Sequence, residues 1–330
     1  MRLPRRLGCA PRRMRVTTSV VGAQHARPAG EAERLAHDVV AALRGTLPGL
    51  PPSERRIAEH VIAHPAAVVD QTITELAASC STSIASVVRF CRHVGFAGYR
   101  EFRRALASSV GRDEVSLSRF GVSDSDIDPG DSARDVIAKL AFHEARSIEA
   151  TAEGLDADEL DRIVEAVVAA PRIDVYGVAS SGLAATDLQH KLHRIGLTSY
   201  YWSDVHLALM SASVLEPGCI AIGFSHSGLT VEIAEFLAAA RRAGATTALV
   251  TNFRNSPMRE NADHMLTTST SETAYRPGNM SSRIAQLAVV DFLFVRIAQR
   301  LYRSSEPELQ ATYDAVQPHR LDKGRPRSAG

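Results

Sequence analysis

The stretch "CIAIGFSHSGLTVE" (residues 219–232) passes from an apolar run through a loop of hydroxyl side chains into a helical pattern. A short apolar run that ends in such a turn is typical of a buried strand in a parallel sheet. Other runs share the pattern, namely "RIDVYGV", "LTSYYW", "TTALVTN" and "HMLTTS". Helical segments separate several of them, so residues 133–304 are predicted to form a three-layer α/β domain around a parallel sheet.

The rest of the chain differs from this region in composition. A length of 330 residues favours two domains. Residues 32–111 have helical periodicity and are predicted to form an all-α domain. Residues 112–132 are rich in Ser, Asp and Gly and are expected to be an interdomain linker. The basic segment 1–31 and the polar segment 305–330 are predicted to be flexible tails.

Composition argues against several classes of protein. The cysteines are scattered and form no CxxC pair, which argues against a zinc site or a disulfide framework and is typical of the cytoplasm. The most apolar stretch, residues 284–298, carries Asp291 and Arg296 and is interpreted as a buried helix instead of a membrane span. We therefore expect a cytoplasmic protein with no metal, no cofactor and no membrane contact.

Positive charge is concentrated in the N-terminal third. Residues 1–111 hold sixteen arginines against eight acidic residues, although the whole chain has a net charge of only +1. The remainder of the chain must therefore be acidic. Part of the excess belongs to the basic tail, and the asymmetry predicts that the N-terminal part meets a polyanion.

The segment "TITELAASCSTSIASVVRFCRH" (residues 72–93) reads as two short helices separated by a turn. Thr72 and Glu75 have the spacing of a capping box, which begins the first helix. Ser83 is expected to cap the second helix. Apolar residues at i, i+3, i+4 and i+7 predict that its core face consists of Ile84, Val87, Val88 and Cys91.

This is the arrangement of a helix-turn-helix, whose second helix enters the major groove of DNA. Arginine can bind guanine or phosphate, short hydroxyl side chains permit close approach, and later arginines suit phosphate contacts. Pattern alone leaves open a three-helix module whose polar face binds nothing. The predicted DNA-binding residues are Ser83, Ser86, Arg89, Arg92, His93, Arg100 and Arg103.

Two loops carry hydroxyl side chains at the start of a helix, the loop in "YGVASSGLAATD" (residues 176–187) and that of the opening stretch. Helix N-termini favour anions, and loops that follow parallel strands face one crevice. A serine hydrolase does not fit, because Ser227 replaces the second glycine of G-x-S-x-G. Each serine can also be read as a simple helix cap. The pair of loops predicts a phosphomonoester site made of Ser180, Ser181, Ser225, Ser227, Gly228 and Thr230.

The residues "PSERRIAEHV", "ITELA", "VVRFCR" and "GFAGYREFR", together with the Ser83 cap, resemble the N-terminal domain of RpiR/MurR-type transcriptional regulators. The resemblance covers about residues 50–106 and is specific in combination. It implies a helix-turn-helix that binds DNA. Ser81 stands where the family usually has glycine in the turn, so Ser81 must either adopt a positive φ or re-route the turn.

Residues from about 134 to 303 resemble the sugar isomerase (SIS) domain, through "YGVASSGLAATDLQHKLHRIG", "HLALMSASVL", "GFSHSGLTVE", "ALVTNFRNSPM" and "SSRIAQLAVVDFLF". In that family the residues matching Ser181, Ser225, Ser227 and Thr230 bind the phosphate of a phosphosugar. The first turn usually reads Gly-x-Gly-x-Ser, but Ala179 replaces the second glycine here. Its methyl group is expected to narrow the approach to the ligand. SIS domains occur both in isomerases and in sensors.

Together these features imply a transcriptional regulator that binds a double-stranded DNA operator, senses a sugar phosphate and controls carbohydrate-metabolism genes. Dimeric helix-turn-helix proteins read paired half-sites, so a homodimer or homotetramer is expected. The alternative is a phosphosugar aldose–ketose isomerase, which needs a general base near the sugar. No spacing singles out one candidate for that base among Glu232, Glu272, His190, His193 and His206.

Overall fold

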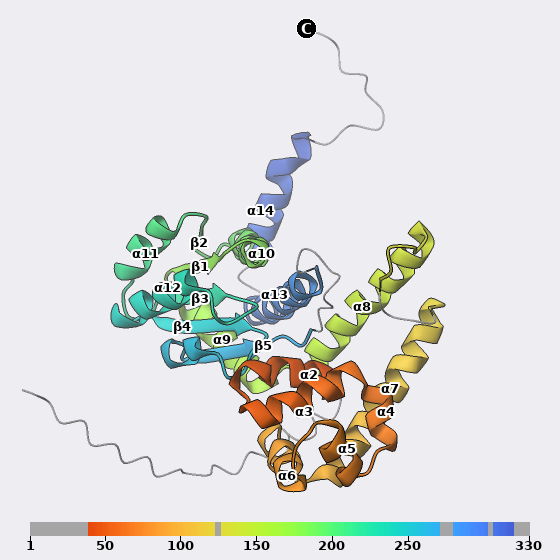
Figure 1. Ribbon diagram of the computed structural model, residues 1–330. Coiled ribbons are helices and arrows are strands. Elements are labelled where there is room, and N and C mark those ends of the chain that lie inside the picture. The colour runs from red at the N-terminus through yellow and green to blue at the C-terminus, as the bar shows by residue number, and fades with distance from the viewer. Residues whose placement is uncertain (1–38, 123–126, 271–279, 303–305, 320–330) are drawn as a thin grey trace, which may run out of the picture.

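The computed structural model describes residues 39–122, 127–270, 280–302 and 306–319. The predicted basic tail (1–31) lies outside these ranges. A helical domain and an α/β domain are joined by two long helices, α7 (Tyr99–Phe120) and α8 (Ala133–Gly154), as Figure 1 shows. In the ranges described, no helix has both the length and the apolar character that a membrane crossing requires.

The helical domain is built around buried aromatic and aliphatic side chains. Phe102 of α7 is fully buried and contacts Phe90 and Phe96 edge to face, at ring-centroid distances of 5.5 and 5.4 Å. Such aromatic pairs stabilise a core by more than the burial of their apolar surface alone would provide. Besides the N-terminal half of α7, the domain contains α2 (Val39–Thr46), η1 (Leu47–Gly49), α3 (Pro52–Ala63), α4 (Pro65–Asp70), α5 (Ile73–Ser79) and α6 (Ile84–His93).

The connection between the domains is more helical than its composition indicates. α7 continues through Gly111 and ends at Gly121, whose φ of 68° is the left-handed conformation that ends many helices. The prediction of a linker over 112–132 is therefore wrong for its first part, which is helix up to Phe120.

Two contacts hold the C-terminal half of α7 against α8. Arg146 Nε lies 2.9 Å from Asp113 Oδ1, and the Arg146 side chain is buried. The rings of Phe120 and Phe142 meet edge to face at 6.2 Å. These contacts come from the helix that follows in the sequence, and they support α7 beyond Gly111.

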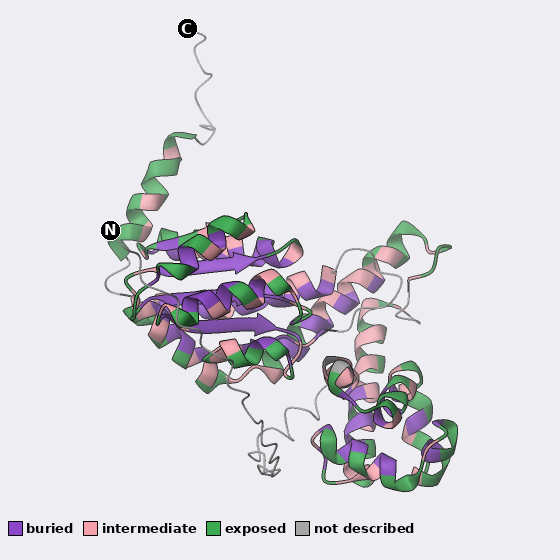
Figure 2. Ribbon diagram, turned by 60° about the vertical axis from the view of Figure 1, so that its left-hand side comes forward, coloured by how far each residue is buried: buried purple, intermediate pink, exposed green. Residues whose placement is uncertain are grey.

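The α/β domain contains one parallel sheet with the strand order β2-β1-β3-β4-β5. Its strands are those predicted, so the expected parallel sheet is confirmed. Figure 2 shows that the central strands are buried along their length. The strands are β1 (Ile173–Gly177), β2 (Ser199–Trp202), β3 (Ile220–Phe224), β4 (Thr246–Thr251) and β5 (His264–Thr267).

Helices cover both faces of the sheet, which confirms the predicted three-layer architecture. Apolar residues of α9 (Ala157–Ala169), α10 (Ser180–Arg194) and α13 (Met280–Arg300) form one core cluster with the sheet. Those of α11 (Val205–Ser213) and α12 (Val231–Arg242) form a second cluster on the opposite face, which the short η2 (Pro257–Asn261) also joins.

The C-terminal segment forms structure that its composition does not indicate. α14 (Glu306–Val316) and η3 (Gln317–His319) lie within the predicted flexible tail 305–330, so that prediction is wrong for residues 306–319. Acidic residues in the first turn of α14 interact favourably with the helix dipole. Leu309 packs partly buried against the core, while the rest of the helix projects from the α/β domain (Figure 1).

Candidate functional site

Local capping interactions define the two short helices of the helix-turn-helix. Thr72 Oγ1 accepts from the Glu75 amide at 3.3 Å, and Glu75 Oε2 accepts from the Thr72 amide at 2.7 Å, which completes the predicted capping box. Ser83 Oγ accepts from the Ser86 amide at 3.2 Å and caps α6 as expected. The turn between the helices contains Ser81, whose φ is 48°.

Side chains of α3 fix the position of α6. Arg56 donates from Nε to the Cys80 carbonyl and from Nη2 to the Ser81 carbonyl, both at 3.4 Å, and so holds the turn. His93 Nδ1 lies 2.9 Å from Oε2 of Glu54, a buried carboxylate. His93 therefore connects α6 to α3, a structural contact in addition to its predicted place on the DNA-binding face.

The orientation of α6 differs from the predicted one by part of a turn. Phe90 is fully buried, and together with Val87 and Cys91 it forms the centre of the helix face that packs into the core. Ile84 consequently lies outside the core with 47% of its surface exposed, and its predicted core position is wrong. Ser86 is only 6% exposed, so it does not project outward as predicted.

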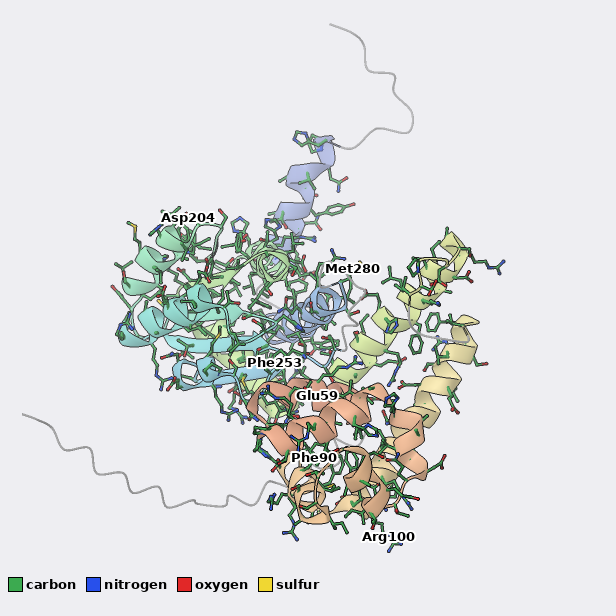
Figure 3. The ribbon with its side chains drawn as sticks, in the orientation of Figure 1. Glu59, Phe90, Arg100, Asp204, Phe253 and Met280 are labelled. Carbon is green, nitrogen blue, oxygen red and sulfur yellow. The ribbon has the colours of Figure 1, made fainter. Side chains whose placement is uncertain are left out.

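The basic side chains lie on the outer side of the domain. Arg89 and Arg92 are exposed on α6, and Arg89 Nη2 donates to the buried Ser86 Oγ at 3.0 Å. Arg100 and Arg103 lie in the first turns of α7, and Figure 3 shows Arg100 at the end of the domain where α6 also lies. Four of the predicted basic residues are thereby presented on the exposed side of the helical domain.

The two hydroxyl loops leave adjacent strands at the same edge of the sheet. Gly177, the last residue of β1, pairs in register with Phe224, the last residue of β3. β1 leads to α10 on one face, and β3 leads to α12 on the other. In parallel sheets, ligands bind at the carboxyl ends of strands where the connections diverge in this way. The loops that carry the predicted phosphate-binding residues therefore leave the sheet at the same edge, where such a crevice is expected.

In the loop after β1, the backbone at Gly177 lies very close to the backbone at the start of α10. A Cβ on Gly177 would lie 2.6 Å from the Ser181 carbonyl oxygen, and a Cβ on Gly182 would lie 2.9 Å from both the Gly177 carbonyl oxygen and Tyr201 Oη. Only glycine fits at these two positions. Ser180 and Ser181 begin α10, the first half-buried and the second buried.

Ala179 is the N-cap residue of α10 and has φ 53° and ψ −124°. A residue with a Cβ rarely adopts such angles, and the strain is on the order of 1–3 kcal/mol. Among the residues described, only Ser81 shares a positive φ without being glycine. Both positions depart from the glycine expected by family resemblance, and both retain a glycine-like backbone, so neither turn is re-routed.

Hydroxyl groups also hold the loop after β3 in place. Ser225 Oγ lies 2.9 Å from Thr230 Oγ1, and Ser227 Oγ accepts from the second amide after it at 3.2 Å. Ser256 Oγ donates to the Gly228 carbonyl at 2.7 Å. Gly228 has φ of 62°, and a Cβ there would lie 2.7 Å from the Ser256 side chain. Ser225 is buried, whereas Ser227 is exposed.

The two loops share features that suit a phosphorylated ligand. α10 and α12 both begin at this edge of the sheet, and helix N-termini attract anions through their amides and dipoles. Serine and threonine hydroxyls add rotatable donors that can follow the oxygens of a phosphate. In the part of the chain that is described, no cluster of His, Cys, Asp and Glu side chains is arranged to hold a metal ion.

Sequence patterns did not identify a set of buried polar side chains at the start of α13. Ser281, Ser282 and Gln286 lie in the first two turns of α13 and are at most 1% exposed. The signal in the sequence is the interruption of an otherwise apolar helix stripe by polar residues. Hydrophobic periodicity alone assigns such positions to the core.

Two protein-family models match the chain in the order of its domains. The helix-turn-helix domain of the rpiR family matches residues 38–112, and the SIS domain matches residues 167–296. The first range covers the helical domain and the second covers the sheet with the hydroxyl loops.

Two relatives and one solved structure match over most of their own length. An uncharacterized HTH-type transcriptional regulator of Caldanaerobacter subterraneus is 38% identical over 285 residues, which cover 86% of this chain and 99% of the relative. The HTH-type regulator YbbH of Bacillus subtilis is 31% identical over 273 residues, 82% of this chain and 94% of YbbH. A solved structure, the Vibrio vulnificus NanR protein complexed with ManNAc-6P, is similar with a TM-score of 0.55 and 30% identity, covering 86% of this chain and 100% of NanR.

Proposed function

The chain belongs to the rpiR family of helix-turn-helix transcriptional regulators, and from this we propose that it binds operator DNA with α6 and senses a sugar phosphate between β1 and β3. The observation that carries the proposal is the presence, on one chain, of an outward arginine face and two hydroxyl loops at one crevice. The complex of NanR with ManNAc-6P supports a phosphorylated sugar as the ligand. The regulated genes are those of carbohydrate metabolism, and the protein acts in the cytoplasm.

DNA binding is tested by comparing two arginines. Arg89 lies on α6, where it can reach base edges, whereas Arg103 lies on α7, where it suits a phosphate. Anisotropy titrations compare a duplex selected from a random library with a scrambled duplex. Arg89→Ala is expected to reduce the preference for the selected duplex, and Arg103→Ala to weaken both alike. Identical behaviour of the two variants would refute the groove assignment.

Salt dependence gives a second test. Binding through several phosphate contacts releases counterions, so the affinity is expected to fall steeply as the salt concentration rises. A flat dependence would refute DNA binding itself.

Ligand binding is tested by a thermal-shift panel of sugar phosphates with wild type, Ser181→Ala and Ser227→Ala. A ligand that binds the folded protein raises its melting temperature. Both substitutions are expected to diminish the shift, because Ser181 lies in the first turn of α10 and Ser227 lies in the loop after β3, where the phosphate is proposed to bind. A shift that survives both substitutions would place the ligand elsewhere.

Homodimer formation is part of the proposal, because helix-turn-helix proteins read half-sites in pairs. Several large apolar side chains on α11 and α12 are exposed, including Leu207, Met210 and Val231. Exposed apolar groups that lie together are typical of interaction surfaces. Sedimentation velocity of the full chain would measure the assembly, and a monomer at all concentrations would contradict it.

We propose binding without catalysis at this site. Among the candidate bases for isomerisation, Glu232 and His206 lie in the first turns of α12 and α11, two helices that begin at the carboxyl edge of the sheet. His190, His193 and His206 are exposed on α10 and α11, and Glu272 lies outside the residues described. An isomerase assay across hexose and pentose phosphates tests this, and turnover lost in Glu232→Gln would favour the enzyme.

A further inference from the structure

Gln286 is a polar side chain within an apolar stripe of α13. Val289, Val290, Leu293 and Ile297 on this helix belong to the core that packs against the sheet. Gln286 precedes them at i, i+3, i+4, i+7 and i+11, which is the spacing of one helix face. Its side chain therefore enters the same layer, and it is only 1% exposed.

The amide nitrogen of Gln286 has no hydrogen-bond partner among the described residues. Burying an amide donor without a partner is unfavourable, so most buried amides in folded proteins are paired. The Gln286 amide nitrogen is therefore a candidate for contact with a ligand.

The position of Gln286 along α13 places it toward the carboxyl edge of the sheet, the edge at which the hydroxyl loops also lie. α13 follows β5 and so begins at the carboxyl edge of the sheet, and Figure 3 labels Met280 at its start. At 1.5 Å per residue, Gln286 lies about 6 Å nearer that edge than Val290. Val290 packs in the same cluster as Phe224, the last residue before the Ser225 loop.

We propose that Gln286 Nε2 donates a hydrogen bond to an oxygen of the sugar, and so selects the sugar while the hydroxyl loops bind its phosphate. This assignment rests on the proposed function of the crevice. An amide donor requires an oxygen acceptor, which in a phosphorylated monosaccharide is a hydroxyl group or the carbonyl of an acetamido group. Gln286 would thus determine which sugar phosphate is recognised.

The test uses a variant that removes the donor and keeps the shape. Gln286→Met in the full chain is titrated calorimetrically with N-acetylmannosamine 6-phosphate, glucose 6-phosphate and glycerol 3-phosphate. Loss of one hydrogen bond is expected to lower the affinity for the preferred sugar phosphate about three- to tenfold. Binding of glycerol 3-phosphate, which has no sugar, is expected to remain unchanged. Loss confined to the acetamido sugar identifies its carbonyl as the acceptor, and loss for both sugars identifies a hydroxyl.

Gln299→Met is the matched control, because Gln299 lies exposed near the other end of the same helix. It is expected to bind every probe as the wild type does. The free proteins give a second readout. Gln286→Met is expected to melt at or above the wild-type temperature, because an unpaired buried donor has been removed.

Three results would overturn the assignment. Equal sugar affinity in wild type and Gln286→Met would show that the amide does not contact the sugar. If Gln286→Met weakens the binding of glycerol 3-phosphate as much as that of the sugar phosphates, the amide contacts the phosphate and not the sugar. A lower melting temperature in both Gln286→Met and Gln286→Leu would show that the amide has a partner in the free protein. If Ser181→Ala also leaves all binding unchanged, the crevice itself is the wrong site, and the proposed function fails with it.

Discussion

Replacing Ala179 with glycine is expected to stabilise the α/β domain. The residue has φ 53° and ψ −124°, and the strain of such a backbone is about 1–3 kcal/mol for a residue with a Cβ. Glycine removes that strain, but the greater conformational entropy of the unfolded chain lowers the stability by about 0.5–1 kcal/mol. The expected net effect of Ala179→Gly is a gain of about 0–2.5 kcal/mol in the free energy of unfolding.

Trp202 makes the measurement specific to this domain, because it is the one tryptophan in the chain. It lies at the end of β2, and its Nε1 donates to the buried Asp174 at 3.1 Å. Urea unfolding followed by its fluorescence therefore reports on the sheet and not on the helical domain. Ala179→Gly is expected to raise the midpoint of this transition without changing its slope.

Ala138→Gly is the matched control, because Ala138 lies inside the regular helix α8. There the same substitution is expected to cost about 1 kcal/mol. If Ala179→Gly also lowers the midpoint, the turn before α10 is not strained, and the explanation given for its backbone angles is wrong.

Other substitutions and reagents probe separate parts of the molecule. Gly228→Ala is expected to lower the free energy of unfolding by about 1–3 kcal/mol, because its φ is positive and a Cβ would clash with Ser256; an unchanged urea midpoint would contradict this. Hydrogen bonds from Thr72 hold the pKa of Glu75 below its ordinary value, so Thr72→Ala is expected to raise that pKa in an NMR titration. The stability from this contact is fully present above the ordinary pKa of a glutamate and is lost as pH falls through the lowered value. Burial raises the pKa of Cys91 to about 12, so iodoacetamide at neutral pH is expected to alkylate this thiol only after unfolding, as peptide mass spectrometry would show.

Features that depend on neighbours in the sequence could be predicted well. The capping box at Thr72 and the cap at Ser83 involve residues three positions apart, and both are present. The strands were recognisable because each is a short apolar run bounded by turn residues. The parallel order follows from the alternation of these runs with helices.

Features that depend on distant contacts could not be read from local patterns. The core face of α6 is centred on Phe90, which exposes Ile84 and buries Ser86. α7 continues beyond Gly111 because residues of α8 support it. The unpaired amide of Gln286 becomes visible only when the contacts of a buried helix are known.

The length of α7 turns a small change of angle into a large movement of the DNA-binding surface. Its 22 residues extend about 33 Å at 1.5 Å per residue. A tilt of about 10° at Phe120, the end that contacts Phe142, would displace the opposite end by about 6 Å, as a lever arm does. Electron–electron distance measurements between spin labels on the two α6 helices of a dimer, with and without sugar phosphate, would detect such a shift, and unchanged distances would exclude it. Successive base pairs are about 3.4 Å apart. This tilt alone would therefore move the two α6 helices out of register with the half-sites of one operator, while every hydrogen bond within each domain stays intact.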